Sequence, residues 1–395
     1  MLETADAPPE AEADIAYFDH NATTPVDPRV RDAMLPWLAG VHGNPSSAHA
    51  AGRRAKQAVE AARAQVAAAL GGRPEEVIFL SSGTEANNMV IAGLARHHGH
   101  RGRLVVNTLE HPSVRNAAAK AGARGMEVVT LRPGADGRID PADATAALDD
   151  ATRLLCLMQA NNEVGTLQPV AEVSAACRRR GVPVLCDAVQ AIGKVAIDVD
   201  ALGVDYLVLG GHKFHGPLGV AALWVRSGAL VEPLMVGAPQ EGGRRASTEN
   251  VPAIVGLGEA CALAQRDLET RHAQLLALRQ RFEAGLGRIG DAVVHCADSQ
   301  RLPHTSHVAF LGVSGHALML ELDRAGVCVS TGSACHSGKP QPSAALVAMG
   351  VSEAEALASL RISFGLTNTA DEVDRLLATL ETVVASLRAR AEVPV

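Results

Sequence analysis

Apolar positions follow two different spacings along the chain after about residue 52. Residues 53–72 carry apolar side chains at helical spacing and end at a Gly-Gly pair, which predicts a helix. Residues 84–98 repeat this helical pattern directly after the apolar run 76–80, which is typical of a short buried strand. Further apolar runs predict strands that begin near residues 104, 127, 153, 182, 205 and 220. Helical patterns separate most of these runs, so the sequence predicts an α/β fold with a largely parallel central sheet.

The pattern changes near residue 249, and the C-terminal part looks different. One long helical pattern runs from about residue 251 to 286. After it come strand patterns at 307–311, 328–330 and 361–364, a helix near 316–326, and a last helix from 371 to about 390. We therefore expect a large α/β domain over residues 15–260 and a smaller α+β domain over residues 261–395, preceded by a mobile tail of residues 1–14.

Composition and charge narrow the classes of function. The 395 residues are 47% hydrophobic, which is enough for a large core and for two domains. The net charge is -7 and Lys and Arg are scattered, which argues against nucleic acid as the main partner. Apolar runs fall short of the roughly 20 residues that a membrane span needs, and the acidic N-terminus is unlike a secretory or transit peptide. We expect a cytoplasmic protein that does not bind membranes.

The cysteines do not have the spacing of a structural framework. The sequence has seven, an odd number, widely spaced and without a CxxC pair, so neither a disulfide framework nor a metal site is predicted. Four of them lie among apolar residues and are expected to be small core side chains: Cys156, Cys186, Cys261 and Cys328.

Polar side chains follow the predicted strands, where open α/β sheets bind their ligands. The loops at these strand ends contribute Thr84, His111, Asn162, Asp187, Gln190, His212 and Lys213. Each residue alone has an ordinary explanation: Thr84 as part of a helix cap, and Lys213 as an exposed lysine. Because several strands deliver polar groups to one edge of the sheet, we expect a site there.

This set of groups suits the aldehyde cofactor pyridoxal phosphate (PLP). PLP needs a lysine for a Schiff base, a carboxylate for its ring nitrogen and a phosphate cup. One predicted strand separates Asp187 from Lys213, which places both at neighbouring strand ends. Lys213 lies in a glycine-rich turn, GGHKFHG, and we interpret these glycines as allowing the backbone to approach the cofactor closely.

Ten motifs occur in order from about Tyr17 to about Ser386: DHNATTPVDP, GNPSS, SSGTEANN, LEHPSV, NNEVGTLQP, CDAVQAIGK, GGHKFHGPLG, ASTENVP, STGSACHSG and SLRISFG. Together they resemble the cysteine desulfurases, which are class V aminotransferase-like, fold-type I PLP enzymes. The resemblance implies that Lys213 forms the internal aldimine and moves the proton at the substrate Cα. It also implies that Asp187 pairs with the ring nitrogen, that Gln190 bonds the ring hydroxyl, and that His111 stacks on the ring and assists acid–base steps.

The resemblance also implies a phosphate site and a homodimer. Gly83, Thr84 and His212 would hold the phosphate, and Thr248 would reach it from the neighbouring subunit. Many members of the family have a serine where this chain has Gly210, so one hydroxyl contact is absent here. Backbone N–H groups of residues 210–211 are expected to replace it in part.

The remaining residues concern the substrate and the sulfur. By resemblance, Asn162, which also belongs to the cofactor site, and Arg361 would hold the substrate carboxylate, for which a guanidinium fork is suited. Cys335 lies in the small, polar stretch STGSACHSG, so it is either an accessible nucleophile, a chance exposed thiol or a buried cysteine of the small domain. In the family this cysteine takes the sulfur as a persulfide. His336 and His111 are both candidates for activating it.

The resemblance implies conversion of L-cysteine to L-alanine, with a role in sulfur metabolism and iron–sulfur cluster assembly and a sulfur-acceptor or iron–sulfur scaffold protein as partner. A selenocysteine lyase carries the same motifs and remains an alternative. A simple aminotransferase would leave Cys335 without a role. A non-enzymatic PLP-binding scaffold, and a metal-binding or thiol-redox protein, are further alternatives, the last disfavoured by the lack of paired ligand spacing.

Overall fold

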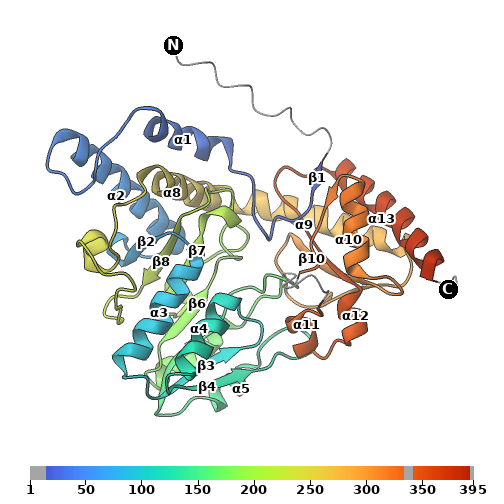
Figure 1. The fold of residues 1–395 in the computed structure, drawn as a ribbon, viewed down its shortest axis with the longest axis horizontal. Helices are drawn as coiled ribbons and strands as arrows, with labels where there is room; N and C mark the ends of the chain where they lie inside the picture. The colour runs from blue at the N-terminus through green and yellow to red at the C-terminus, as the bar shows by residue number, and fades with distance from the viewer. Residues whose placement is uncertain (1–14, 333–340, 392–395) are drawn as a thin grey trace.

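The computed structural model describes residues 15–332 and 341–391, so the predicted tail at 1–14 lies outside the described residues (Figure 1). Its largest sheet has seven strands in the order β2-β8-β7-β6-β5-β3-β4. These strands are β2 (Val77–Leu80), β3 (Arg103–Asn107), β4 (Glu127–Leu131), β5 (Thr152–Cys156), β6 (Val184–Asp187), β7 (Tyr206–Gly210) and β8 (Ala221–Val225). β8 is antiparallel to both of its neighbours, β2 and β7, and the other pairs of neighbouring strands in this sheet are parallel, so the prediction of a largely parallel sheet is confirmed.

Both faces of this sheet are covered by helices, which is why its strands read as continuous apolar runs. In β7, Leu207 and Leu209 point into one core, whereas Tyr206 and Val208 point into the other. The first core includes side chains from α2 (Ala50–Leu70), α5 (Pro141–Ala146), α6 (Val170–Arg179), α7 (Val199–Leu202) and α8 (Val251–Arg266). The second includes side chains from α3 (Gly83–His97) and α4 (Pro112–Gly122), and α1 (Pro28–Ala39) packs against α8.

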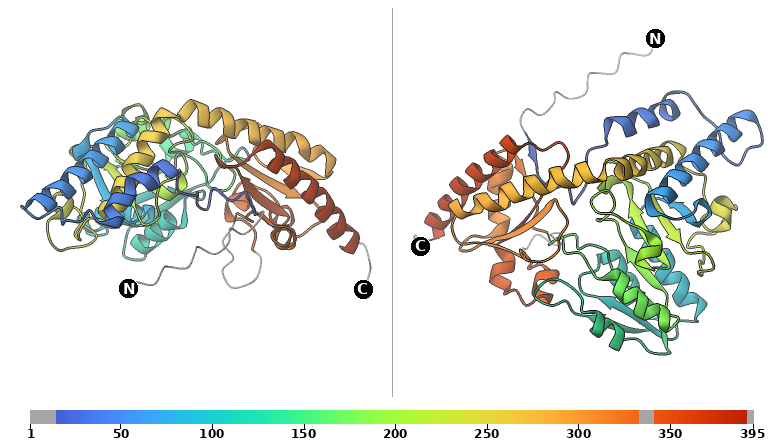
Figure 2. Two further views of the ribbon diagram at one scale, coloured as in Figure 1. Left: turned by 90° about the horizontal axis from the view of Figure 1, so that it is seen from above. Right: turned by 180° about the vertical axis from the view of Figure 1, so that it is seen from behind.

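The C-terminal part is built on a three-stranded antiparallel sheet in the order β12-β10-β9. Its strands are β9 (Ala292–Val294), β10 (Thr305–Phe310) and β12 (Ser359–Ser363), and its helices are α9 (Leu268–Gly285), α10 (Gly315–Arg324), α11 (Ala344–Ala348), α12 (Glu353–Leu357) and α13 (Ala370–Ala391). Figure 2 shows α9 running on from the end of α8 and lying beside α13. In the parts of the chain that are described, no helix has both the length and the apolar character to cross a bilayer.

The N-terminal segment belongs to the C-terminal part rather than to the large sheet. The short strand β1 (Ala16–Tyr17) pairs in parallel with β11 (Val327–Cys328). Phe18 follows it and is fully buried in the C-terminal core, where its ring meets Phe364 edge-on. The chain then crosses to the large sheet, so residues after Phe18 lie between the two parts.

The prediction of a single helix from about residue 251 to 286 is wrong. α8 ends at Arg266 and α9 begins at Leu268, because Asp267 has a non-helical backbone and bonds Arg266 and Arg29 with its carboxylate. The side chain of Cys261 packs in the core of the large sheet, and the side chains of α9 pack in the C-terminal core. The domain boundary proposed at residue 260 stays a prediction.

The cysteine assignments are partly corrected. Cys156, Cys186 and Cys261 are buried as expected, but Cys328 at the end of β11 is partly exposed. Cys177, which was not assigned to the core, is buried on α6 instead.

Candidate active site

A cavity of about 430 Å³ lies where the ends of the large-sheet strands face the N-terminal segment and β12. Its lining includes these predicted residues: Gly83, Thr84, His111, Asn162, Asp187, Gln190, His212, Lys213 and Arg361. Thr248 is exposed and does not line the cavity of its own chain. Cys335 and His336 lie outside the described residues. Sequence reasoning missed Asp19, Asn21, Ser82, Asn87 and Ser113, which also line the cavity.

Lys213 enters the cavity from the one-turn helix η2 (Gly211–Lys213) that follows β7. Its Nζ donates to the carbonyl oxygens of Asn21 at 2.7 Å and Ala22 at 2.6 Å. Burial, assisted by the charge of Arg361, lowers the pKa of the Lys213 ammonium to about 8. A primary amine with this pKa is partly neutral near pH 7 and is therefore able to attack an aldehyde.

Position 216, in the turn that carries Lys213, requires glycine for a steric reason that the sequence did not indicate. A Cβ on Gly216 would lie 2.8 Å from the carbonyl oxygen of Gly211, so a side chain does not fit there. Gly216 N donates to that same oxygen at 2.9 Å, which closes the turn on itself. The close approach at Gly216 is therefore between two parts of the turn.

Asp187 ends β6 and is 7% exposed, with its carboxylate in the cavity wall. Asn87 Nδ2 donates to Oδ2 at 2.8 Å, and Val189 N donates to Oδ1 at 3.1 Å. Asn87 lies one helical turn beyond Gly83 on α3, so helical spacing places both on the face toward the cavity. That spacing is the signal from which Asn87 was predictable.

His111 caps the N-terminus of α4 and lines the same cavity. Its Nδ1 accepts from Ser113 N at 3.1 Å, so the proton of the neutral ring is assigned to Nε2. Desolvation lowers the pKa of His111, while the nearby Asp187 carboxylate opposes the shift. The imidazole is thus held in one orientation and predominantly neutral at pH 7.

The end of the cavity at α3 suits an anion. Ser82 caps this helix by accepting from Glu85 N at 3.1 Å, and Gly83 and Thr84 form the first turn. The first N–H groups of a helix have no intrahelical acceptors and attract phosphate. Burial lowers the pKa of His212 to about 4, so this ring is neutral at pH 7 and bonds Thr23 Oγ1 at 3.2 Å.

Of the two backbone N–H groups expected to replace the missing hydroxyl at Gly210, that of Gly211 already has a partner. Gly211 N already donates to Val220 O at 3.2 Å, so it is not available to a phosphate. An added Cβ on Gly210 would meet Val189 at 3.7 Å, which is ordinary van der Waals contact. Packing therefore does not require glycine at position 210.

Arg361 lies on β12 at the side of the cavity formed by the C-terminal part, and it is 5% exposed. Nη1 donates to Asn162 O at 3.0 Å, and Nη2 pairs with Asp19 Oδ1 at 2.6 Å. The Asn162 carbonyl also accepts from Asn21 Nδ2 at 3.1 Å. Thus the guanidinium is placed by the N-terminal segment and by the loop after β5 together.

The residues present fit PLP. The cavity combines an amine, a supported carboxylate and an anion-binding helix terminus, which are the groups that PLP requires. Gln190 Nε2 donates to Asn21 O at 2.9 Å, while its buried Oε1 has no protein partner among the described residues. A cavity of about 430 Å³ also has the size of an ordinary small-molecule site.

These features define an α/β enzyme of the PLP-dependent type, and comparison with known proteins gives its family. The model of the class-V aminotransferases matches residues 16–376. A cysteine desulfurase of Trichormus azollae is 40% identical over 376 residues, covering 95% of this chain and 94% of that protein.

Solved structures agree with this assignment. A NifS-like protein superposes with a TM-score of 0.89 at 35% identity, covering 94% of this chain and all of that one (100%). A second structure, described as SspA in complex with cysteine, has a TM-score of 0.79 at 34% identity, with 88% and 98% of the two chains covered. The chain therefore belongs to the class-V aminotransferase family, whose members are PLP enzymes, and within that family to the cysteine desulfurases.

Proposed function

We propose that this protein binds PLP through Lys213 and converts L-cysteine to L-alanine, with the sulfur passing to Cys335. The observation that carries the proposal is the convergence of Lys213, Asp187 and Arg361 on one cavity. The substrate class is supported by the 40% identity to a cysteine desulfurase and by the relative solved in complex with cysteine. The reaction balances as cysteine plus enzyme thiol giving alanine plus enzyme persulfide.

The cofactor would be held by groups at both ends of the cavity. Gly83, Thr84 and His212 would bind its phosphate, and Asp187 would pair with its ring nitrogen. Gln190 would bond the ring hydroxyl, and Asn162 would complete the contacts. When bound, PLP supplies an aldehyde that condenses with amines and a ring that accepts electrons from the substrate carbon.

The substrate would be oriented by Arg361 and Asn162. The guanidinium presents donors in a planar fork that matches a carboxylate. Lys213 would take the proton from the substrate Cα and return it to the product, for which a pKa of about 8 is well matched near neutral pH. His111, fixed by Ser113, would lie against the ring and take part in proton transfer.

The sulfur would leave the substrate by bonding to the thiolate of Cys335. The substrate C–S bond breaks, and its electron pair stays with carbon, which is then protonated to give alanine. Gly332, three residues before Cys335 in the sequence, lines the cavity and supports this role. A sulfur-acceptor or iron–sulfur scaffold protein would then take the sulfur, in a cytoplasmic setting.

A second copy of this chain would complete the site. Thr248 is exposed and is proposed to reach the phosphate of the partner subunit. Large apolar side chains are exposed on α1 and on the loop before β8, with Leu38 at 63% and Leu218 at 70%. Met34 and Pro217 both lie within 3 Å of the position of a Cβ on Gly256, so these two segments are neighbours. Sedimentation of the purified protein tests the homodimer.

Selenocysteine is the second candidate substrate. It presents the same amino and carboxylate groups to Lys213 and Arg361, so the residues that would hold the substrate do not distinguish sulfur from selenium.

Product analysis tests the proposed function. Purified protein loaded with PLP is incubated with cysteine or with selenocysteine in the presence of a reductant, and alanine is measured. We expect a visible Schiff-base band that borohydride abolishes, and alanine formation from cysteine. A protein that binds no PLP, or that binds PLP but makes no alanine from cysteine, would contradict the proposal.

Replacement of Asp187 by alanine is expected to lower kcat by about 100-fold or more, which corresponds to about 2.7 kcal/mol. The ring nitrogen then lacks a carboxylate to keep it protonated, so it accepts electrons less well. Asp187→Glu retains the charge and should lose less activity, and Asp143→Ala, an exposed aspartate on α5, is the matched control. Wild-type kcat in both Asp187 variants would reduce this residue to a structural partner of Asn87.

A further inference from the structure

A second lysine is buried directly behind Lys213. Lys194 is 4% exposed, and its Nζ donates to the carbonyl oxygens of Lys213 and Gln190, each at 3.0 Å. Burial, and then the charge of Lys213, lower the pKa of Lys194 to about 7. A buried amine is retained at such a position only where its hydrogen bonds are made, and two of them are made to the backbone of predicted site residues.

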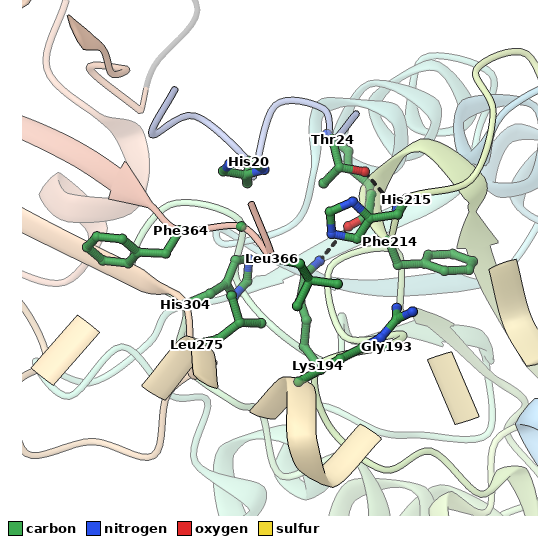
Figure 3. A pocket seen from close by; sticks show the side chains of 13 residues that line it. His20, Thr24, Gly193, Lys194, Phe214, His215, Leu275, His304, Phe364 and Leu366 are labelled. Atoms are coloured by element: carbon green, nitrogen blue, oxygen red, sulfur yellow. Dashed lines mark hydrogen bonds between the residues drawn. The ribbon is translucent and has the colours of Figure 1, made fainter. Parts of the chain in front are cut away.

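The side chain of Lys194 borders a second, smaller cavity, which Lys213 also lines. Figure 3 shows Lys194, His20, His304 and His215 gathered around this space, which has a volume of about 20 Å³. His20 and His304 are each 1% exposed, and none of their four ring nitrogens makes a well-formed hydrogen bond to a described protein group, although the backbone of Tyr17 and the side chain of Asn368 lie close enough to His20 to raise its pKa. Burial lowers the pKa of His20 to about 4 and that of His304 well below its ordinary value, so both rings are neutral at pH 7.

This cavity has the size and chemistry of a site for one water molecule. A space of about 10–15 Å³ or more holds a water, provided that two to four polar groups surround it. A neutral imidazole offers one donor and one acceptor, and Lys194 has a further hydrogen-bonding position beyond its two carbonyl partners. Among the described residues no group of three or more His, Cys, Asp or Glu is arranged to hold a metal ion, so the histidines around this cavity are not such a site.

The two carbonyls joined by Lys194 belong to different segments of the active site. Gln190 lies in the loop after β6, which also carries Asp187, and Lys213 lies in the turn after β7. Lys194 therefore fixes the backbone from which the Lys213 side chain starts relative to the loop that directly follows Asp187. Displacement of a reacting group by about 1 Å can cost up to about 100-fold in rate.

We propose that Lys194 is a positioning residue for Lys213, and that it acts with one buried water held between its amine and the imidazoles of His20 and His304. The inference rests on the proposed function, since it assigns Lys194 to the placement of the amine that captures PLP. We treat Lys194 as a positioning residue and not as a catalytic one, because it does not line the cavity that Lys213, Asp187 and Arg361 share.

A purely structural role is the alternative that the experiment must exclude. The carbonyl oxygen of Lys194 lies 2.9 Å from His272 Nδ1, so this segment also links the large sheet to α9. A residue that only joined these parts would change the free energy of unfolding without changing how fast the folded protein captures PLP.

The test compares Lys194→Met with Lys120→Met, which replaces an exposed lysine on α4. Apo protein is mixed with PLP in the absence of cysteine, and the rate constant for appearance of the visible Schiff-base band is measured. We expect Lys194→Met to capture PLP about tenfold more slowly and to lose about tenfold in kcat with little change in KM. Lys120→Met should match wild type, and Lys194→Gln, which keeps a donor, should lie between wild type and Lys194→Met.

The outcomes separate this inference from the proposed function. Failure of the wild-type protein to form the band would contradict the proposed function, whereas equal capture rates in wild type and Lys194→Met would overturn only the role of Lys194. If Lys194→Met does not fold, the same comparison is made with Lys194→Gln, and wild-type kinetics there would overturn the inference. A crystal structure in which the cavity beside Lys194 Nζ holds no water would overturn the proposed water.

Discussion

Replacement of Lys213 by alanine is expected to reduce alanine formation by at least about 1,000-fold. Both functions proposed for Lys213 would be lost together: the amine that would form the Schiff base with PLP and the base that would take the proton from the substrate Cα. The position of Lys213 is the reason to expect that no other lysine takes over its role. Lys213 Nζ is held by the carbonyls of Asn21 and Ala22 inside the cavity, whereas Lys194 is bound to backbone behind it.

The Lys213→Ala protein should still bind PLP, because Asp187 and the first turn of α3 remain. The bound cofactor would then be released by dialysis with excess amine and would resist borohydride trapping on the chain. Lys213→Arg is a second variant that keeps the positive charge but not the primary amine, and Lys120→Ala is the control. Retained turnover in Lys213→Ala above a small background would show that another group forms the Schiff base.

The presence of Asp187 and Lys213 in one cavity was predictable, because the strand that precedes each residue is visible in the local sequence. Both residues follow apolar runs that contribute side chains to the two cores of the sheet, as Leu207 and Val208 of β7 do. A run of this kind predicts a strand, and a parallel sheet brings the carboxyl ends of its strands to one edge. Only the prediction of a largely parallel sheet had to be correct for these two residues to line the same cavity.

The contribution of the N-terminal segment was not predictable from such local patterns. Phe18 is buried in the C-terminal core, while Asn21, three residues later, bonds Gln190 at the large sheet. This crossing depends on the pairing of β1 with β11, whose strands are too short to show any periodicity. The hydrogen bond of Arg361 to Asp19 depends on the same crossing and was missed for the same reason.

The break between α8 and α9 was missed because the apolar pattern continues across it. Asp267 is a poor helix interior residue but also a common surface residue, so its presence alone does not end a helix. The carboxylate of Asp267 makes a tertiary ion pair with Arg29, which the sequence does not indicate. The need for glycine at position 216 was likewise not predictable, because a side chain there would collide with the backbone of the same turn, which is seen only in the folded structure.

Cys335→Ala is expected to abolish alanine formation from cysteine while leaving the Schiff-base band and its change on adding cysteine intact. A carbon–sulfur bond does not break readily without an acceptor for the sulfur, and Cys335 is the proposed acceptor. Selenium leaves carbon more readily, so the same variant should retain measurable activity on selenocysteine. Mass spectrometry of the wild-type protein after turnover should find one additional sulfur on the peptide that contains Cys335.

The matched control is Cys296→Ala, and the structure explains why this substitution should leave activity unchanged. Burial raises the pKa of Cys296 to about 11 and also raises the pKa of the thiols of Cys156, Cys177 and Cys186, so these groups stay protonated at neutral pH. A protonated thiol is a poor nucleophile, and none of these cysteines lines the cavity that holds Lys213. Cys296→Ala should therefore make alanine at the wild-type rate. If Cys335→Ala still desulfurates cysteine at that rate, the sulfur leaves by another route and the persulfide is not formed at Cys335.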